Sequence, residues 1–370
     1  MSSLTIGSHT LTWGERTYVM GILNITPDSF SGDGLLPSPP SPSRSTSSPE
    51  GISYPQGISS PKGTPVGLPP AGEGGGSREV GGEALNQARR FLAAGADILD
   101  IGGESTRPGS LPVDAEEEKR RVLPVIRAIA SEFPDALISI DTCKAAVAGE
   151  ALRAGAHIIN DVWGLRADPE LAALAARARA PVILMHNRSK PANVEVRERR
   201  GSPGSSVIVP VPGRGTGLGK AYAGAEYENL LEDVKRELMD SVQIARSAGI
   251  PDERILLDPG IGFGKTVEQN LELINRLDEI RLLGFPILLG PSRKSFIGYT
   301  LNLPPDQRVE GTAAAVAVGI TRGADIVRVH DVEAMVRVAR MTDALVRPWQ
   351  SRFPRGSPGS STGDGAGKHV

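Results

Sequence analysis

The sequence predicts a (β/α)8 TIM barrel, an α/β fold in which eight parallel strands alternate with helices. Eight short apolar runs each give way to a segment with helical periodicity, which is the pattern of a parallel α/β protein. Without three stretches rich in Pro, Gly and Ser, the 370-residue chain keeps about 270 residues, close to the roughly 250 typical of such barrels. Polar residues end nearly every apolar run, as expected where all strands open onto one mouth.

The N-terminal segment predicts a β-hairpin ahead of the first barrel strand. Residues 4–16, LTIGSHTLTWGER, precede the first apolar run, and we expect this hairpin to plug the bottom of the barrel. The sequence has no charged-then-apolar leader and no window of about 18 apolar residues. We therefore expect no membrane association and a cytoplasmic location, with no transit peptide in view, although a mitochondrial location is compatible with a eukaryotic source.

Near-continuous apolar runs predict the eight barrel strands, because parallel strands in such folds are buried on both faces. In chain order these runs occupy residues 18–24, 97–102, 137–141, 157–161, 181–186, 254–258, 286–290 and 325–330. Amphipathic or alanine-rich segments separate them, and several of these end in Gly just before the next strand, as helix C-caps do. The main helical segments are residues 83–96, 115–133, 169–180, 230–250 and 267–284.

Three segments have a composition that cannot bury enough apolar surface to order itself. They are residues 35–78, 188–222 and 351–370; within the second, SVIVPVP can form a short edge strand. The predicted organisation is a single barrel domain over residues 1–350 with disordered insertions at 35–78 and 188–222, and a disordered tail. Because loop-closure entropy grows slowly with length, we expect no catalytic part for the first insertion.

A doubly wound parallel sheet is the competing architecture. It would gather ligand residues at one switch point, whereas polar residues here end nearly every strand. An Asp or Asn at a strand end often only caps a helix or supports a turn, but so many together favour a shared barrel mouth. They are Asn24, Asp141, Asn160, Asp161, His186, Asp258, Arg328 and His330.

Charge and cysteine content exclude several classes of protein. Lys and Arg number 41 against 43 Asp and Glu, so we expect neither nucleic acid nor an anionic membrane as a partner. The one cysteine, Cys143, cannot form an intrachain disulfide, which fits a reducing compartment. Set among small residues, it is expected to be a structural thiol rather than a nucleophile.

The glycine-rich stretch DPGIGFGKT, residues 258–266, invites a nucleotide-binding interpretation. The phosphate-loop pattern G-x-x-x-x-G-K-[ST] requires glycine where Pro259 stands, so the match fails. The glycines are spaced G-x-G-x-G, which also differs from the dinucleotide pattern G-x-G-x-x-G. We therefore expect a flexible loop that carries Phe263 beside Asp258.

A second loop, GPSRKSFIG at residues 290–298, follows the seventh strand. It places Arg293, Lys294 and Ser295 at the predicted mouth. A basic pair in a loop is usually a solvated surface feature, but other cations are expected at the same mouth, namely Arg107, Arg328 and His330. Such a cationic rim suits an anionic substrate or leaving group.

Together these motifs resemble the dihydropteroate synthase family. The segments ILNITPDSFS, DIGGESTRPG, SIDT, IINDV, DPGIGFGKT, LLGPSRKSFIG and GTAAAVAVGITRGADIVRVHDV occur in the family's order and cover the barrel, though not the three low-complexity segments. The resemblance implies a transferase of folate synthesis that condenses 6-hydroxymethyl-7,8-dihydropterin pyrophosphate with p-aminobenzoate, giving 7,8-dihydropteroate and pyrophosphate. It also implies Mg2+ as cofactor, a homodimer, and sulfonamides as inhibitors.

The resemblance further implies a set of site residues. Those implied to be catalytic are Lys294, Arg328, His330, Asp141 and Asp258. Those implied around the pterin are Asp141, Asn160, Asp258, Lys294, Met185, Phe263 and Gly290. Those implied at the pyrophosphate are Asn24, which also lies near the metal, Arg328 and His330. Two mobile loops are implied at Thr26, Asp28, Ser29 and Phe30 and at Ser105, Thr106, Arg107 and Pro108, and p-aminobenzoate is implied to lie against Ser295, Phe30 and Pro108.

Two other functions are compatible with a pterin pocket. A folate-dependent methyltransferase of the same fold would need neither the Arg328 and His330 pair nor the SRKS loop, so both features favour the synthase. A pterin-binding module without catalysis is the other alternative, if the insertions obstruct the site.

Overall fold

The structure is a computed structural model that describes residues 3–25, 76–104, 112–189, 194–198, 206–210 and 225–347. Eight strands form one parallel sheet in the order β10-β7-β6-β5-β4-β3-β12-β11. A parallel bridge between Leu257 and Ile287 brings its two edges together, which completes the barrel. The strands are β3 (Tyr18–Asn24), β4 (Ile98–Gly102), β5 (Leu137–Asp141), β6 (Ile158–Asp161), β7 (Val182–Met185), β10 (Ile255–Asp258), β11 (Leu288–Leu289) and β12 (Ile326–Val329).

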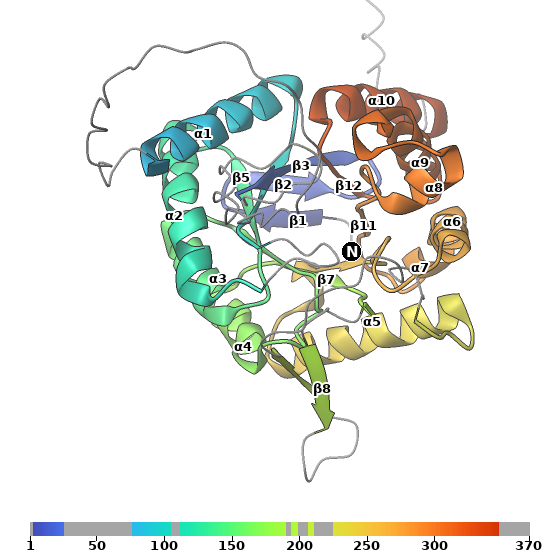
Figure 1. Cartoon of the computed structure of the whole chain (residues 1–370), viewed down its shortest axis with the longest axis horizontal. Coiled ribbons are helices and arrows are strands. Elements are labelled where there is room, and N and C mark those ends of the chain that lie inside the picture. The colour runs from blue at the N-terminus through green and yellow to red at the C-terminus, as the bar shows by residue number, and fades with distance from the viewer. Residues whose placement is uncertain are drawn as a thin grey trace, which may run out of the picture.

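Every predicted strand is confirmed, and so is the barrel rather than a doubly wound sheet. The helices form a ring around the strands (Figure 1). They are α1 (Gly76–Ala94), α2 (Ala115–Glu132), α3 (Ala145–Ala154), α4 (Pro169–Ala178), α5 (Leu230–Ser247), α6 (Val267–Asn275), α7 (Leu277–Arg281), α8 (Ser295–Leu301), α9 (Val309–Thr321) and α10 (Val332–Val346), with short 3-10 turns at η1 (Asp252–Arg254) and η2 (Pro305–Gln307).

Several helices begin at side chains that cap them. Asp114, Asp168 and Asn229 accept backbone N–H groups at the start of α2, α4 and α5. Thr266 and Gln269 form a capping box at the start of α6. These caps satisfy orphan donors of the first helical turn, so each helix starts immediately after its loop.

Side-chain alternation along the strands produces two apolar layers. One lies between the strands and the helices and includes Leu99, Ile101 and Leu257. The other lies inside the barrel near the N-terminal ends of the strands and includes Ile98 and Ile326. Because successive side chains of a strand point to opposite faces, the inward residues closer to the C-terminal ends are left to form the site.

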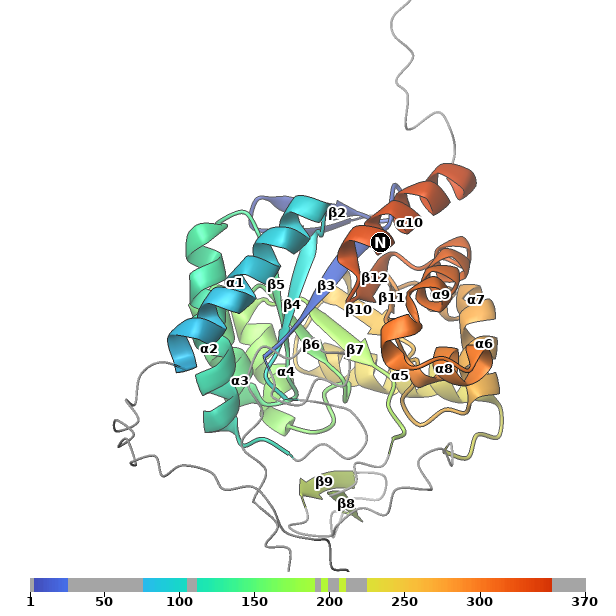
Figure 2. The same ribbon diagram turned by 45° about the horizontal axis from the view of Figure 1, so that its top comes forward.

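The predicted N-terminal hairpin is confirmed as β1 (Ser3–Ile6) and β2 (His9–Thr12), paired antiparallel. Its Leu4, Ile6 and Leu11 are buried in the inner apolar cluster. Burial of each of these three aliphatic side chains stabilises the fold by about 1.5–3 kcal/mol. The hairpin therefore plugs the bottom of the barrel, where Figure 2 shows it across one end of the strands.

The last helix is joined to the start of the first barrel strand. Asp343 on α10 accepts hydrogen bonds from the Thr17 backbone N–H at 2.7 Å and the Thr17 hydroxyl at 2.8 Å. Both residues are buried. In the described part of the chain, no helix has the length and hydropathy to cross a bilayer.

The predicted insertion boundaries need correction where the structure describes them. Residues 76–78, placed in the first insertion, are the first turn of α1, so Gly-rich composition concealed a helix start. Within the second insertion, β9 (Ser206–Pro210) confirms the expected edge strand, and it pairs with β8 (Val194–Glu198), which was not predicted. The rest of both insertions, apart from 188–189, and residues 351–370 lie outside the described residues.

Candidate active site

A group of polar side chains fills the barrel interior above the apolar plug. Asp100 illustrates why they face inward, because its neighbours Leu99 and Ile101 pack outward against the helices. The same alternation turns Asn160, Asp258 and Arg328 toward the barrel axis. These side chains are carried by β6, β10 and β12, so residues far apart in the sequence meet at the C-terminal ends of the strands.

Arg328 is the centre of this polar group. Its Nε donates to Asp100 Oδ2 at 2.6 Å, and its Nη2 donates to Asp141 Oδ2 at 2.6 Å. Asn160 Nδ2 donates to the same Asp100 oxygen at 3.2 Å. One guanidinium therefore ties together β4, β5 and β12, with β6 attached through the amide.

The charges in this group modify one another. Burial raises the pKa of Asp141 to about 7, against the attraction of Arg328, and the nearby Asp100 carboxylate adds to the rise. Although burial opposes it, Asp100 and Asp141 raise the pKa of Arg328 above its usual value. The arrangement is a permanent cation shared by two buried carboxylates.

Asp258 forms the opposite wall with the two loops that follow β10 and β11. Its Oδ1 accepts the Gly260 backbone N–H at 2.7 Å. Burial raises the pKa of Asp258, opposed by that N–H and by the cations Lys294, Arg328 and Lys265. Lys294 Nζ lies 3.9 Å from the centre of the Phe263 ring, a cation–π contact.

Three more of the implied site residues border this wall. Met185, at the end of β7, is buried. A Cβ added at Gly290 would lie 3.9 Å from the Arg328 Cβ and 4.0 Å from Asp258 Oδ2, so this position borders both side chains. His330, just beyond β12, is held by Ser292, whose Oγ accepts the His330 backbone N–H at 3.1 Å and lies 3.0 Å from Nδ1.

Asn24 ends β3 at the rim of the barrel. In the strand register it pairs with Gly102, which in turn pairs with Asp141, so the amide lies at the same level as the site. Ser295 is the first residue of α8, next to Lys294. The other implied residues, Thr26, Asp28, Ser29, Phe30, Ser105, Thr106, Arg107 and Pro108, lie outside the described residues.

Three polar residues expected at the mouth have other partners. Asp161 accepts the backbone N–H groups of Trp163 at 2.9 Å and Leu165 at 2.6 Å, so it supports a turn. His186 is fully buried against Lys265. Both point away from the axis because their neighbours Asn160 and Met185 point toward it. Arg293 pairs with Asp331 at 2.9 Å and so stabilises its loop.

Two buried charges in and behind the polar group were missed by sequence reasoning, Asp100 and Lys265. Asp100 interrupts the apolar run DILDIG, and a charge within a buried strand was the available signal. Lys265 lies in the GFGKT stretch, whose glycines predicted a flexible, exposed loop and so gave no signal that this lysine is buried. Burial also raises the pKa of the Cys143 thiol, in line with the structural role expected for it.

Asn24, implied to lie near a Mg2+ ion, has a side-chain oxygen at the rim of the mouth. No group of three or more His, Cys, Asp or Glu side chains able to hold a metal occurs among the described residues. Mg2+ commonly keeps several waters and takes one or two protein oxygens plus substrate phosphates. The Asn24 amide oxygen at the rim is a ligand of that kind.

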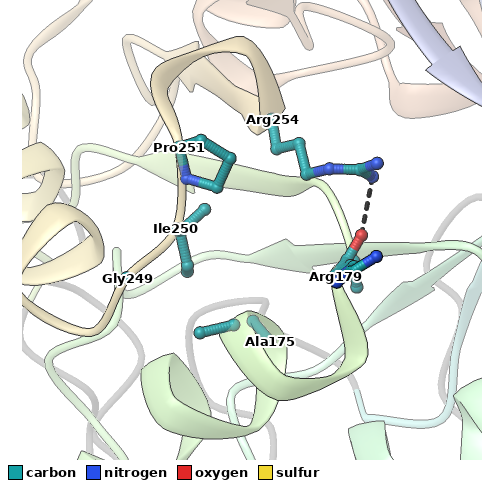
Figure 3. Close-up of a pocket in the computed structure, with 8 residues that line it drawn as sticks. Ala175, Arg179, Gly249, Ile250, Pro251 and Arg254 are labelled. Atoms are coloured by element: carbon teal, nitrogen blue, oxygen red, sulfur yellow. Dashed lines mark hydrogen bonds between the residues drawn. The ribbon is translucent and has the colours of Figure 1, made fainter.

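A separate hollow of about 330 Å3 lies at the other end of the barrel strands (Figure 3). It is lined by residues of α4 and of the segments that precede β7 and β10, including Ala175 and Ile250. Arg254 Nη1 donates to the Arg179 carbonyl at 2.6 Å across it. It contains none of the polar group around Arg328, so it is distinct from the candidate site.

Comparisons with known proteins identify the family of this chain. A family model described as pterin binding enzyme matches residues 74–330. The dihydropteroate synthase of Clostridium beijerinckii is 42% identical over 345 residues, which is 93% of this chain and 100% of that protein.

Two solved structures resemble the whole chain. The dihydropteroate synthase of Clostridium difficile, determined in the presence of pteroic acid, has 39% identity and a TM-score of 0.67, covering 91% of this chain and 99% of its own. The dihydropteroate synthase of Yersinia pestis, in complex with a sulfonamide drug, has 35% identity and a TM-score of 0.71, covering 93% and 98%. With a pterin-binding family match and these relatives along nearly its full length, the chain belongs to the dihydropteroate synthase family.

Proposed function

We propose that this protein condenses 6-hydroxymethyl-7,8-dihydropterin pyrophosphate with p-aminobenzoate to give 7,8-dihydropteroate and pyrophosphate. The observation that carries the proposal is the inward layer of Asp141, Asn160 and Asp258 around Arg328. A donor-rich aminopterin needs buried acceptors, and a diphosphate needs fixed cations. Pteroic acid and a sulfonamide in the related structures support a small-molecule site of this class.

The pterin fits between the two walls of the barrel. Asp141 and Asn160 lie on one side and Asp258 on the other, so their oxygens can accept hydrogen bonds from the edge of the ring. Lys294, positioned over Phe263, contacts the ring, and the buried Met185 covers its inner side. Each hydrogen bond from the substrate to these acceptors contributes to binding, because leaving a buried donor or acceptor unpaired costs about 1–3 kcal/mol of free energy.

The pyrophosphate group is assigned to Arg328, His330 and Asn24. A guanidinium has five N–H donors, and the Asp100 and Asp141 carboxylates accept from two of its nitrogens. The remaining donors can hold phosphate oxygens in a fixed direction. Asn24 would hold Mg2+ through its amide oxygen, and the ion, when bound, would neutralise further charge on the diphosphate.

The chemistry asks the protein for positioning and for stabilisation of the leaving group. Pyrophosphate departs from an activated methylene, and the electron-rich dihydropterin ring stabilises the cation that remains. The p-aminobenzoate amine, placed against Ser295, then attacks this carbon and releases one N–H proton to solvent. No strong base is required, so the absence of a nucleophile–base pair from the proposed roles is chemically consistent.

We also propose a homodimer formed through the last helices. Apolar side chains are exposed on α8, α9 and α10, and these helices pack beside one another. The exposed apolar side chains are Tyr299, Leu301, Val318, Met341, Leu345 and Val346.

A cytoplasmic location is proposed on the single cysteine, which suits a reducing compartment.

The activity is tested by incubating the purified protein with Mg2+ and both substrates. Dihydropteroate, followed by mass spectrometry, is expected to form together with an equal amount of pyrophosphate, and only when p-aminobenzoate is present. Methyltetrahydrofolate consumption in a parallel reaction would instead indicate the methyltransferase alternative. Pterin binding without any product, in folded protein at saturating substrates, would contradict the proposal in favour of a binding module.

A further inference from the structure

Lys265 lies behind the proposed pterin pocket and has no role in the function described above. It is 1% exposed. Its Nζ lies 3.0 Å from His186 Nδ1, 2.9 Å from the Gly260 carbonyl and 3.1 Å from the Phe263 carbonyl. An ammonium has three N–H donors, and these three acceptors match them one for one. The buried charge is therefore fully hydrogen-bonded within the protein.

The ammonium ties down the loop between β10 and α6. Gly260, Gly262 and Gly264 have positive φ angles of 71°, 83° and 67°, a conformation that favours glycine. A Cβ on Gly260 would lie 1.8 Å from the His186 carbonyl oxygen, so the loop packs directly on the backbone beyond β7. The loop expected to be flexible from its glycines is thus anchored from beneath by Lys265.

This anchoring reaches two walls of the pterin pocket. Gly260 gives its carbonyl to Lys265 and its N–H to Asp258 Oδ1 at 2.7 Å, so one peptide links the ammonium to the carboxylate. Phe263 gives its carbonyl to Lys265, and its ring lies under the Lys294 ammonium. A shift of this loop would move an acceptor for the pterin edge and a ring that encloses the pterin.

His186 and Glu237 support Lys265 from the helix side. Because the ammonium donates to Nδ1, the proton of neutral His186 is on Nε2, which lies 3.1 Å from Glu237 Oε2 in a close polar contact rather than a hydrogen bond. Burial lowers the pKa of His186 to about 4, so the imidazole stays neutral. Although burial opposes it, contacts with His186 and Arg188 hold the pKa of Glu237 at about 2, so Glu237 stays charged.

The charge of Lys265 depends on all the groups packed around it. Burial lowers the pKa of Lys265 to about 7. The carboxylates Asp258 and Glu237 oppose this, while the cations Lys294 and Arg188 add to it. The hydrogen bonds that anchor the loop therefore weaken as pH rises through this region.

We propose that Lys265, supported by His186 and Glu237, is a positioning residue that sets the Asp258 carboxylate and the Phe263 ring for the pterin substrate. It acts through the loop and does not touch the substrate. This role rests on the proposed function, since it assigns these walls to the pterin. It predicts a selective effect on the pterin half of the reaction.

The test variant is Lys265→Met, which keeps much of the side-chain length and removes all three donors. A displacement of Asp258 and Phe263 by about 1 Å would weaken their contacts with the substrate. We therefore expect the affinity for pterin pyrophosphate, measured by calorimetry, to fall about 10- to 100-fold. The KM for p-aminobenzoate, measured at saturating pterin, is expected to change less than about threefold, a factor equivalent to under 1 kcal/mol. Hydrogen exchange of ligand-free protein should be faster at residues 258–266.

Asp343→Asn is the matched control. It also weakens a buried hydrogen-bond pair, the one to Thr17, but at the bottom of the barrel. It is expected to lower the melting temperature while leaving pterin affinity and exchange of the loop unchanged. Glu237→Gln is a milder second variant, expected to weaken pterin binding less than Lys265→Met. Because the Glu237 carboxylate raises the pKa of Lys265, pterin affinity in this variant should fall at a lower pH than in the wild type.

The pH profile adds a readout that general destabilisation would not reproduce. Wild-type pterin affinity is expected to fall as pH rises through about 7, and Lys265→Met should lack this component. Equal losses of pterin affinity in Lys265→Met and Asp343→Asn, or unchanged exchange of residues 258–266 in Lys265→Met, would overturn the role of Lys265 alone. Failure of the wild-type protein to bind pterin would instead overturn the proposed function, and this role with it.

Discussion

Arg328 shows how one residue can serve both stability and chemistry. It neutralises Asp100, which is fully buried, and Asp141 at the same time. Removing one partner of a buried ion pair costs about 3–5 kcal/mol, because the other charge is left uncompensated. Arg328→Ala would therefore confuse a loss of catalysis with a loss of folding, and a charge-retaining variant is the better probe.

Arg328→Lys and Asp258→Ala are expected to separate the two halves of the pterin substrate. The lysine keeps the positive charge but loses the planar fork, so kcat should fall about 100-fold, as when a preorganised donor is removed, while pterin affinity changes little.

Asp258→Ala should instead lower pterin affinity, because buried donors of the ligand would be left unpaired at a free-energy cost of about 1–3 kcal/mol. Calorimetry with pterin alone and steady-state kinetics check both. Unchanged pterin affinity in Asp258→Ala would refute the pocket assignment.

At the scale of elements, the pairing of β7 with α5 places an acid-sensitive contact outside the barrel. Met185 takes the inward position at the end of β7, so the next residue, His186, faces α5 and Glu237. Burial there lowers the pKa of His186 from an ordinary value of 6.5 to about 4. Between these values the unfolded chain binds a proton that the native protein refuses.

The contribution of His186 to stability is therefore expected to fall as pH falls from about 6.5 to 4. The contribution is fully present above the unfolded pKa and is lost progressively toward the folded one, up to roughly 3 kcal/mol. Urea unfolding at several pH values measures it, with His186→Gln as the comparison because its amide does not titrate. Equal pH slopes for the two proteins in this window would show that His186 is not the responsible group.

At the scale of the molecule, α8, α9 and α10 lie together on one side of the helical ring (Figure 1), and each carries exposed apolar side chains. Single exposed apolar residues are ordinary on protein surfaces, but a contiguous group marks an association site. Met341 and Leu345 are 60% and 73% exposed, so changing them should cost the folded monomer little.

The double variant Met341→Lys, Leu345→Lys is expected to convert the proposed dimer to a monomer. Two added cations on each copy would repel across a symmetric interface, where a surface patch meets itself. Sedimentation velocity measures the mass. Ala178→Lys, on the exposed side of α4, is the control and should stay dimeric. A wild-type protein that sediments as a monomer would contradict the dimer itself.

Local patterns were sufficient to predict the barrel. Each strand is short and nearly continuously apolar, and each lies where its run was identified, because burial on both faces leaves a pattern that neighbouring residues alone reveal. The hairpin plug and the helical segments that contain α1, α2, α4, α5, α6 and α7 followed from the same local chemistry. Among the site residues, Asp141, Asn160, Asp258 and Arg328 were predicted because polar groups at strand ends are conspicuous after apolar runs, with their roles taken from family resemblance.

Partners of these side chains could not be predicted from the chain alone. Asp100 and Arg328 are 228 positions apart, and they meet only because β12 pairs with β3, which in turn pairs with β4. The directions in which Asp161 and His186 point depend on which residues of their strands face the barrel axis. This is set by the strand register, and a register change of one residue moves every side chain to the opposite face. Lys265 looked like part of a flexible loop until His186, supplied by a neighbouring strand, completed its hydrogen bonds. Periodicity records whether a residue is buried, whereas the identity of its partner is set by long-range packing, which periodicity does not contain.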